Sequence, residues 1–280
     1  MKIGVVANLT KPAAPSVLAR LAAGARQHGL QLLADEATAA LLPGAMVIPA
    51  ERLAERSDLM MALGGDGTML HTVRLLNGRD IPVVGVNLGS LGFMTSIVEG
   101  ELERSLSAIV NGDFTISRRT LLAGRGAGGA WRALNDVVIG WGQSSRVVTL
   151  GLRVDGVDVV SYVCDGLIVS TPTGSTGHSL SAGGPIVHPE APVWVVNPIC
   201  PHSLSNRPMV VPDTARLEVT VLDSPKQQLL VVDGRERGLL GSGDRIEMAR
   251  AEATVRFVHL PGYNYFAVLS RKLHWRGASV

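Results

Sequence analysis

Residues 58–68 decide the fold of the chain, and they read Asp58-Leu59-Met60-Met61-Ala62-Leu63-Gly64-Gly65-Asp66-Gly67-Thr68. Apolar residues lead into a glycine-rich turn, and apolar residues at helical spacing follow it at positions 69, 70, 73 and 76. This order predicts a buried strand, a loop and a helix. The three glycines let the backbone turn sharply and approach a ligand without a Cβ in the way.

The loop can be interpreted in two ways. Its amides and the N-terminus of the following helix suit a phosphate group. A carboxylate such as Asp66 repels phosphates unless it binds a metal ion or removes a proton, and both roles belong to phosphoryl transfer. Alternatively, Gly64-Gly65-Asp66-Gly67 is ordinary turn chemistry, with Asp66 capping the helix. The loop is neither a Walker A motif nor G-x-G-x-x-G, but it resembles the signature shared by NAD kinases, phosphofructokinases and diacylglycerol-type lipid kinases.

The composition is typical of a globular protein of one large or two ordinary domains, with 280 residues, 46% of them apolar and only 4% aromatic. The net charge is +2 and no basic run is long, so we expect no nucleic-acid partner. Cys164 and Cys200 have neither metal-site spacing nor a disulfide pattern, which fits a reducing compartment. No run reaches the length of a membrane span and residues 1–8 are too short for a signal sequence, so we expect a cytoplasmic location and no membrane partner.

The first part of the chain alternates apolar runs with helical patterns. Strands are expected at residues 3–7, 30–34, 46–48, 59–63 and 81–86, and helices near residues 16–28, 35–42, 51–56, 68–76 and 101–110. A second glycine-rich turn follows the strand at 81–86. The alternation predicts a Rossmann-like α/β domain over residues 1–113, with a mostly parallel sheet and ligands at the carboxyl ends of its strands.

From about residue 114 the pattern changes to short β-rich runs between turns, which predicts an all-β antiparallel domain over residues 114–260. The runs lie at residues 115–123, 131–140, 147–154, 157–163, 193–196, 215–222, 228–232, 245–248 and 254–258. Residues 261–280 are expected to carry a C-terminal helix that returns to the first domain, with Phe266, Leu269 and Leu273 on one face. Residues 124–129 match G-x-G-x-x-G literally, but a strand pattern follows, so we interpret them as a mobile hairpin loop.

Residues 164–185 form the second chemically rich segment. An apolar strand at residues 167–169 ends in a run of hydroxyls and glycines, in which Ser175 or Thr176 could cap a short helix. So many small donors near a helix N-terminus suit a ligand with several hydroxyls and phosphates. A surface Ser/Gly loop is the alternative, but the apolar flanks weaken it.

This segment strongly resembles the NAD kinase motif, in which Pro-Thr-Gly-Ser-Thr and Ser-Leu-Ser-Ala-Gly-Gly-Pro follow an Asp-Gly strand. Asn135-Asp136 matches that family's Asn-acidic pair, and residues 198–208 match another family block. Together with the first loop, four blocks stand in the family order over residues 58–210. The resemblance implies a kinase that phosphorylates the adenosine-ribose 2′-hydroxyl of NAD, giving NADP, with ATP or polyphosphate as donor and a divalent cation, expected to be Mg²⁺. It also implies a homodimer or homotetramer.

The resemblance assigns roles in the first domain. Asp66 becomes the candidate base or metal organiser, and Gly64, Gly65 and Gly67 shape the phosphate loop. His71, one helical turn further on, would reach a phosphate, or else it is a solvent-facing helix histidine.

In the second domain, which the resemblance makes the NAD-binding one, Asn135 and Asp136 would hydrogen-bond the dinucleotide. Arg146 would pair with a phosphate or an acidic residue, and Asp165 would bind the nicotinamide side. The nucleotide pocket would be lined by Thr176, Gly177, His178, Ser179, Leu180 and Ser181.

The chain departs from the family pattern at three places. Gly177-His178 stands where Ala-Tyr is usual, and a histidine stacks on a base less extensively than a tyrosine. Asp136 stands where Glu is frequent and reaches one methylene less. Asp233-Gly234-Arg235 aligns with a position that often carries Gln; Arg235 is a candidate binding residue, although a hairpin Asp-Gly turn explains the segment and is the interpretation we favour. Two rival functions remain: another kinase with this glycine loop, acting on a lipid or sugar, and a non-catalytic NAD-binding sensor.

Overall fold

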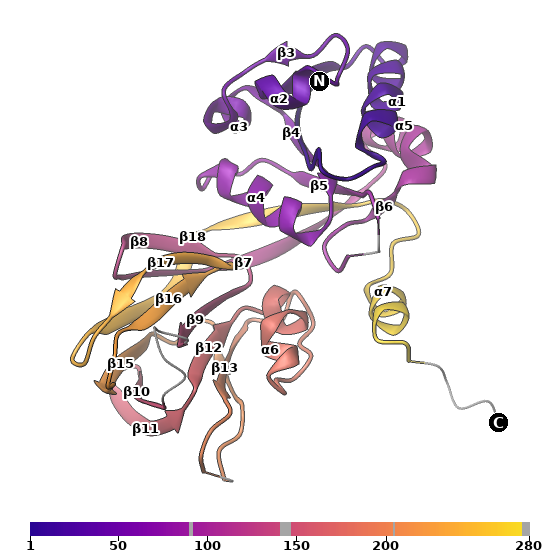
Figure 1. Cartoon of the computed structure of the whole chain (residues 1–280). Helices are drawn as coiled ribbons and strands as arrows, with labels where there is room; N and C mark the ends of the chain where they lie inside the picture. The colour runs from indigo at the N-terminus through magenta and orange to yellow at the C-terminus, as the bar shows by residue number, and fades with distance from the viewer. Residues whose placement is uncertain (90–91, 141–146, 204, 276–280) are drawn as a thin grey trace, which may run out of the picture. The chain divides into compact units, whose positions relative to one another are not determined.

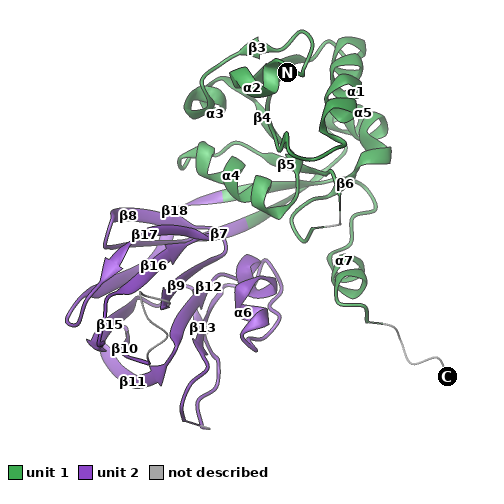
Figure 2. Cartoon of the chain, viewed as in Figure 1, with its two compact units in different colours: residues 1–118, 255–280 green, residues 119–254 purple. Residues whose placement is uncertain are grey.

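A computed structural model describes residues 1–89, 92–140, 147–203 and 205–275 (Figure 1). The chain divides into two compact units (Figure 2). Unit 1 comprises Met1–Arg118 and Val255–Val280, and unit 2 comprises Arg119–Thr254.

Unit 1 is built on a mostly parallel sheet, as predicted. Its strands lie in the order β5-β4-β1-β2-β3, with β6 beside β5, and each of these pairs is parallel. The end of β18 also pairs in parallel with β5, at Phe257 and Val83. The strands are β1 (Lys2–Ala7), β2 (Gln31–Ala34), β3 (Met46–Val47), β4 (Leu59–Gly64), β5 (Val83–Asn87) and β6 (Ile97–Val98).

Helices cover both faces of this sheet. All six residues of β4 are buried, and because side chains alternate along a strand, both faces must be covered. Leu59, Met61 and Leu63 join one core cluster with residues of α1 and α5. On the other face, a Cβ built at Gly85 would meet Met69 of α4. The helices are α1 (Ala14–Gln27), α2 (Glu36–Ala39), η1 (Ala50–Arg52), α3 (Leu53–Arg56), α4 (Asp66–Leu76), η2 (Glu99–Glu101) and α5 (Leu102–Asn111).

Unit 2 consists of two antiparallel sheets, which confirms the predicted β domain. One has the order β14-β13-β12-β9-β16-β17, and the other contains β11-β10-β15-β18 together with the β7–β8 hairpin. Its strands are β7 (Thr115–Gly126), β8 (Gly129–Ala133), β9 (Asp136–Gly140), β10 (Val148–Val154), β11 (Val157–Cys164), β12 (Gly166–Ser170), β13 (Val193–Ile199), β14 (Met209–Pro212), β15 (Leu217–Asp223), β16 (Gln228–Val232), β17 (Arg235–Leu240) and β18 (Arg245–His259). By residue number, β7 and β18 belong partly to each unit.

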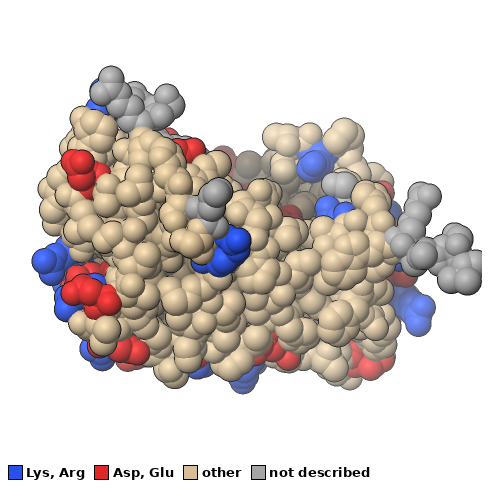
Figure 3. Space-filling view, turned by 90° about the horizontal axis from the view of Figure 1, so that it is seen from below, with Lys and Arg blue, Asp and Glu red and all other residues tan. Residues whose placement is uncertain are grey.

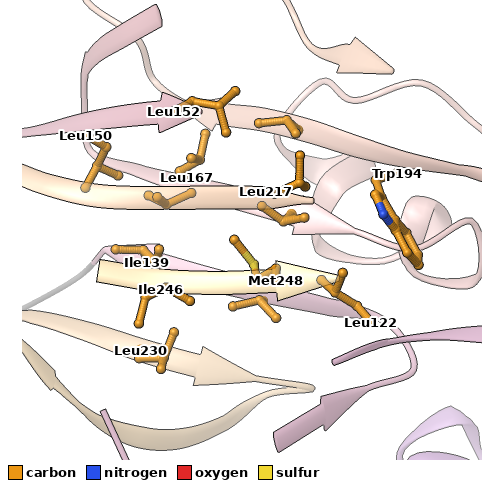
Figure 4. Packing of buried hydrophobic residues seen from close by; sticks show 14 of the residues in the cluster. Leu122, Ile139, Leu150, Leu152, Leu167, Trp194, Leu217, Leu230, Ile246 and Met248 are labelled. Carbon is orange, nitrogen blue, oxygen red and sulfur yellow. The ribbon is translucent and has the colours of Figure 1, made fainter. Parts of the chain in front are cut away.

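The core of unit 2 lies between its two sheets. Ile139 and Leu167 come from one sheet and Leu150 and Leu217 from the other, and all four belong to one buried cluster (Figure 4). Unit 2 is therefore a sandwich of two sheets around a mostly aliphatic core.

Three details differ from the sequence prediction. The expected run at residues 131–140 is two strands, β8 and β9, because the amides of residues 134–136 bond to the side chain of Asp233 instead of continuing a ladder. The runs at 245–248 and 254–258 form the single strand β18, since neither glycine nor proline interrupts them. Strands β14 and β17 were not predicted. The literal G-x-G-x-x-G segment lies in the β7–β8 hairpin, as predicted.

The C-terminal helix α7 spans Tyr265–Lys272, with the Asn264 side chain accepting a hydrogen bond from the Ala267 amide at its start. Of the three residues expected on one face, Leu269 is buried, Leu273 is half-buried and Phe266 is 64% exposed. An eight-residue helix buries only Leu269. Among the described residues, no helix is long and apolar enough to cross a membrane. Figure 3 shows basic and acidic side chains interspersed on the displayed face.

Candidate functional site

The glycine loop of unit 1 lies at the carboxyl end of β4, where the sequence placed it. A Cβ at Gly64 would lie 2.1 Å from the Thr68 Oγ1, so the first turn of α4 can pack on this backbone only because position 64 has no side chain. Gly65 and Gly67 have open space where a Cβ would be. Helix α4 begins at Asp66 with Gly65 as N-cap and no side-chain cap. The Thr68 amide donates to the Gly65 carbonyl (3.0 Å), so the amides of this turn that an anion could use are those of Asp66 and Gly67.

Asp66 does not cap α4, contrary to one of the two interpretations of the loop. Its carboxylate instead accepts hydrogen bonds from the amides of Phe93 and Met94, both at 3.0 Å. Gly92 makes this approach possible, because a Cβ there would lie 2.2 Å from the Asp66 Oδ1. The first glycine loop thus holds the second one through a carboxylate.

This contact was not predicted, although the sequence contains a signal for it. Both glycine turns follow apolar strands, and β4 and β5 are parallel neighbours whose ends pair at Gly64 and Asn87. Turns at the carboxyl ends of adjacent parallel strands meet at one edge of the sheet. His71 lies half-buried on α4. Arg146 lies outside the described residues.

In unit 2, Asn135 lies between β8 and β9 and Asp136 is the first residue of β9. Asn135 is held from the end of β12. The Asn135 carbonyl accepts hydrogen bonds from the Thr171 amide (2.8 Å) and the Ser170 hydroxyl (3.3 Å). Gly174 packs on the same carbonyl, since a Cβ there would lie 2.2 Å from that oxygen. The Asn135 Oδ1 is buried and has no hydrogen-bond partner among the described residues, so this amide is a candidate for ligand recognition.

In the hydroxyl-rich segment after β12, more side chains are buried and bonded to the backbone than the sequence suggested. Ser170, Thr171, Ser175 and Ser179 are fully buried. The Ser170 and Ser175 hydroxyls donate to backbone carbonyls. These hydroxyls therefore shape the loop.

Neither Ser175 nor Thr176 caps a helix as predicted. They belong to η3 (Thr173–Thr176), and Gly177 precedes α6 (His178–Ser181) without a side-chain cap. Asn197 of β13, which sequence reasoning missed, holds α6 by donating to the carbonyls of Ser179 (3.0 Å) and Ala182 (3.3 Å).

The positions of this segment that were predicted to line the nucleotide pocket differ in exposure. Thr176, Gly177, His178 and Leu180 are half-buried, and Ser181 is exposed. Burial lowers the pKa of the His178 imidazole and so favours its neutral form.

Three further predicted positions lie elsewhere in unit 2. Asp165 is half-buried between β11 and β12, and its amide bonds to the Ile199 carbonyl. Asp233-Gly234 is a two-residue hairpin turn between β16 and β17, with positive φ at both residues, as expected of Asp-Gly. Arg235 is exposed directly after it.

The carboxyl group of Asp136 is buried, and burial, followed by the charge of Asp233, raises its pKa to about 7. Asp233 itself is buried and accepts hydrogen bonds from the amides of Leu134 (2.8 Å), Asn135 (2.7 Å) and Asp136 (3.2 Å). Sequence reasoning treated Asp233 only as a turn residue, because a turn Asp and an anchoring Asp look identical in sequence.

The described residues contain no group of three or more His, Cys, Asp or Glu placed to hold an ion, so they do not form a metal site from protein ligands alone. Magnesium in phosphoryl-transfer sites is commonly held by one or two carboxylates and by substrate phosphates. The single carboxylate of Asp66 beside a phosphate-type loop fits that mode.

Comparisons with known proteins agree with this geometry. The ATP-NAD kinase N-terminal domain matches residues 3–114, and the ATP-NAD kinase C-terminal domain matches residues 134–260. The chain is 41% identical over 287 residues to the NAD kinase of Gemmatimonas aurantiaca, covering 100% of this chain and 98% of that one. It is 39% identical over 279 residues to the NAD kinase of Geobacter metallireducens, covering 98% of each.

Two solved structures are similar over the whole chain. An NAD kinase from Archaeoglobus fulgidus in complex with ATP has a TM-score of 0.80 at 26% identity and covers 99% of this chain and 100% of that one. Yeast NADH kinase complexed with NADH has a TM-score of 0.91 at 23% identity, covering 100% and 89%, and shows the likeness of fold. An α/β unit with this glycine loop, an antiparallel β unit and these relatives together identify a phosphotransferase. The chain belongs to the NAD kinase family.

Proposed function

We propose that this chain transfers the γ-phosphoryl group of ATP to the 2′-hydroxyl of the adenosine ribose of NAD, giving NADP. The observation that carries the proposal is the loop after β4, where Gly65 and Gly67 are open and α4 begins without a side-chain cap. Full-length relatives named NAD kinase support the reaction, and the ATP complex of the relative from Archaeoglobus fulgidus supports ATP as donor.

Asp66 would orient the ribose hydroxyl and accept its proton. Its two oxygens are each held by one backbone amide, which fixes the carboxylate and leaves further acceptor capacity on each oxygen. An oriented base loses less entropy in the transition state than a free one. When bound, a magnesium ion would neutralise charge on the donor phosphates, with Asp66 as its protein ligand. The residues support Asp66 as base and as metal organiser alike.

Unit 2 would supply the dinucleotide site. The buried Asn135 Oδ1, which has no hydrogen-bond partner in the part of the chain that the structure describes, supports a role for this amide in hydrogen bonding to NAD. The neighbouring Asp136, with its short side chain, would bond the same ligand. The accessible positions from Thr176 to Ser181, together with Asp165 and Arg235, would line the remainder. His71 and Arg146 would contact phosphate. We further expect a homodimer or homotetramer.

The test is NADP formation from NAD, ATP and magnesium, followed with an NADP-specific dehydrogenase. General-base help is typically worth about 10²–10⁴-fold, so Asp66→Asn should lower kcat by at least that range and leave NAD binding largely intact. Asp35→Asn is the matched control, because the Asp35 carboxylate also accepts a backbone amide at a helix start, from Thr38 at 2.8 Å. We expect this variant to keep full kcat.

Two outcomes would contradict the proposal. Near-normal turnover in Asp66→Asn would remove Asp66 from the chemistry. NAD binding by the wild type without turnover, with either ATP or polyphosphate as donor, would indicate a sensor instead of an enzyme.

A further inference from the structure

The burial and the hydrogen bonds of Asp233 exceed what a hairpin turn requires. Unit 2 contains a second Asp-Gly hairpin, Asp155-Gly156 between β10 and β11, with the same positive φ at both residues. There the Asp is exposed and its side chain accepts one backbone amide, from Arg216. Asp233 is only 8% exposed and accepts three. Turn chemistry explains the residue at position 155 but leaves the burial of Asp233 unexplained.

The three amides belong to residues 134–136, which carry the candidate NAD-binding pair. Asp233 is tied to the same segment a second time, because its own amide donates to the Asp136 carbonyl at 3.0 Å. Burying a carboxylate is costly unless it is hydrogen-bonded, and these amides supply the bonds. The bonds interrupt the strand between β8 and β9 and leave Asn135 at the break, with its Oδ1 buried and unpartnered among the described residues.

The Asn135 side chain lies beside the accessible part of the segment after β12. A Cβ built at Gly177 would lie 3.9 Å from the Asn135 Nδ2. The backbone of Asn135 is held on one side by the end of β12 and on the other by Asp233, so two anchors from different strands fix the backbone from which its side-chain amide projects. The anchor from the β16–β17 hairpin is a carboxylate that can be altered by substitution, whereas on the other side the Thr171 amide (2.8 Å) makes a shorter bond than the Ser170 hydroxyl (3.3 Å).

We propose that Asp233 is a positioning residue for NAD recognition: its carboxylate fixes residues 134–136 and thereby orients the Asn135 amide toward the dinucleotide. The inference rests on the proposed function, since it assigns NAD to this part of unit 2. Asp233 acts through Asn135 and Asp136.

The charge of Asp233 provides a second readout. Asp136 has a pKa raised to about 7 by burial and, secondarily, by Asp233. Strand β12 places Ser170 opposite Asp136, and β16 ends at Val232 directly before the turn, so Asp233 is the ionisable group beside Asp136 among the described residues of these neighbours. Removing its negative charge favours the ionised form of Asp136 and must lower that pKa.

The experiment measures the Kd for NAD by calorimetry between pH 6 and 8. Asn tolerates positive φ as well as Asp does, so Asp233→Asn and its matched control Asp155→Asn leave both turns intact. We expect Asp233→Asn to raise Kd at least fivefold at pH 7 and to move the pH-dependent limb of NAD binding to lower pH. Asp155→Asn should stay within twofold of wild type. If the Asn variant does not fold, Asp233→Glu keeps the charge, displaces the carboxylate and should also weaken binding at least fivefold.

A double-mutant cycle with Asn135→Ala separates positioning from general stability. If Asp233 orients Asn135, Asp233→Asn should lose most of its effect on Kd in the Asn135→Ala background, and the shift of the pH limb that comes through Asp136 should remain. An equal loss in both backgrounds, an unmoved pH limb, or a wild-type Kd in Asp233→Asn would overturn the inference. Because Kd is read without turnover, a wild type that binds NAD but forms no NADP contradicts the proposed function and still decides the role of Asp233. A wild type that does not bind NAD contradicts both.

Discussion

The contact between Asp66 and the second glycine turn can be broken without touching Asp66 itself. In Gly92→Ala the new Cβ would start 2.2 Å from Oδ1, 2.9 Å from Cγ and 3.2 Å from Oδ2 of Asp66. Ordinary non-bonded contact is about 3.5 Å or more, so the carboxylate or the backbone of residues 92–94 must move by about 1 Å. The two amide bonds, now at 3.0 Å, cannot both survive such a shift.

The expected size follows from the loss of one bond to a charged acceptor, which is worth about 1.5–3 kcal/mol. If that energy orients Asp66 for the reaction, kcat should fall by roughly tenfold to a hundredfold, because each 1.36 kcal/mol is a factor of ten. The assay is kcat for NADP formation together with the thermal midpoint. Gly89→Ala is the matched control in the same turn, since its Cβ would meet only Lys11 Nζ at 3.9 Å.

Three results would refute this reasoning. If Gly92→Ala keeps the wild-type kcat and thermal midpoint, the two amide bonds do not orient Asp66. If kcat rises, the amides restrain Asp66 and turnover requires its release. A decrease in both Gly92→Ala and Gly89→Ala would place the effect in the turn as a whole.

Two further predictions concern unit 2. Gly174→Ala should destabilise the protein strongly, because its Cβ would meet the backbone oxygen of Asn135 at 2.2 Å. Gly177→Ala should lower the free energy of unfolding by only about 1 kcal/mol or less, since the nearest neighbour of its Cβ lies at 3.3 Å. The thermal midpoints of the two variants check this difference. The pKa of Asp136 is raised from 3.8 to about 7, so between these pH values the folded state binds one more proton than the unfolded state. The free energy of unfolding should therefore fall by up to about 4 kcal/mol as the pH rises from 4 through 7. Asp136→Asn should remove that part of the decline, and unfolding followed at pH 5 and pH 8 would contradict the assignment if the variant declined as steeply as wild type.

The α/β architecture was predictable because its signals are local. A strand buried on both faces appears in the sequence as a continuous apolar run, and a glycine turn followed by a helical pattern predicts a loop and a helix after that strand. The break at residues 134–135 was not predictable, because it depends on a carboxylate 98 residues further along the chain. Strand β17 was missed for a similar reason: its burial alternates only weakly, and pairing with β16 makes it a strand.

The candidate site shows the same division between local and distant information. A sequence reveals that residues 170–181 are rich in hydroxyls, but whether a hydroxyl bonds to a ligand or to its own backbone depends on the atoms that folding brings near it. Ser175 bonds to the carbonyls of Pro172 and Val187 and is closed to solvent, whereas Thr176 beside it is not. We therefore expect the half-buried positions that follow Ser175 to be the part of this segment that influences substrate preference. Gly177-His178, where the chain departs from the usual family pair, lies among those positions.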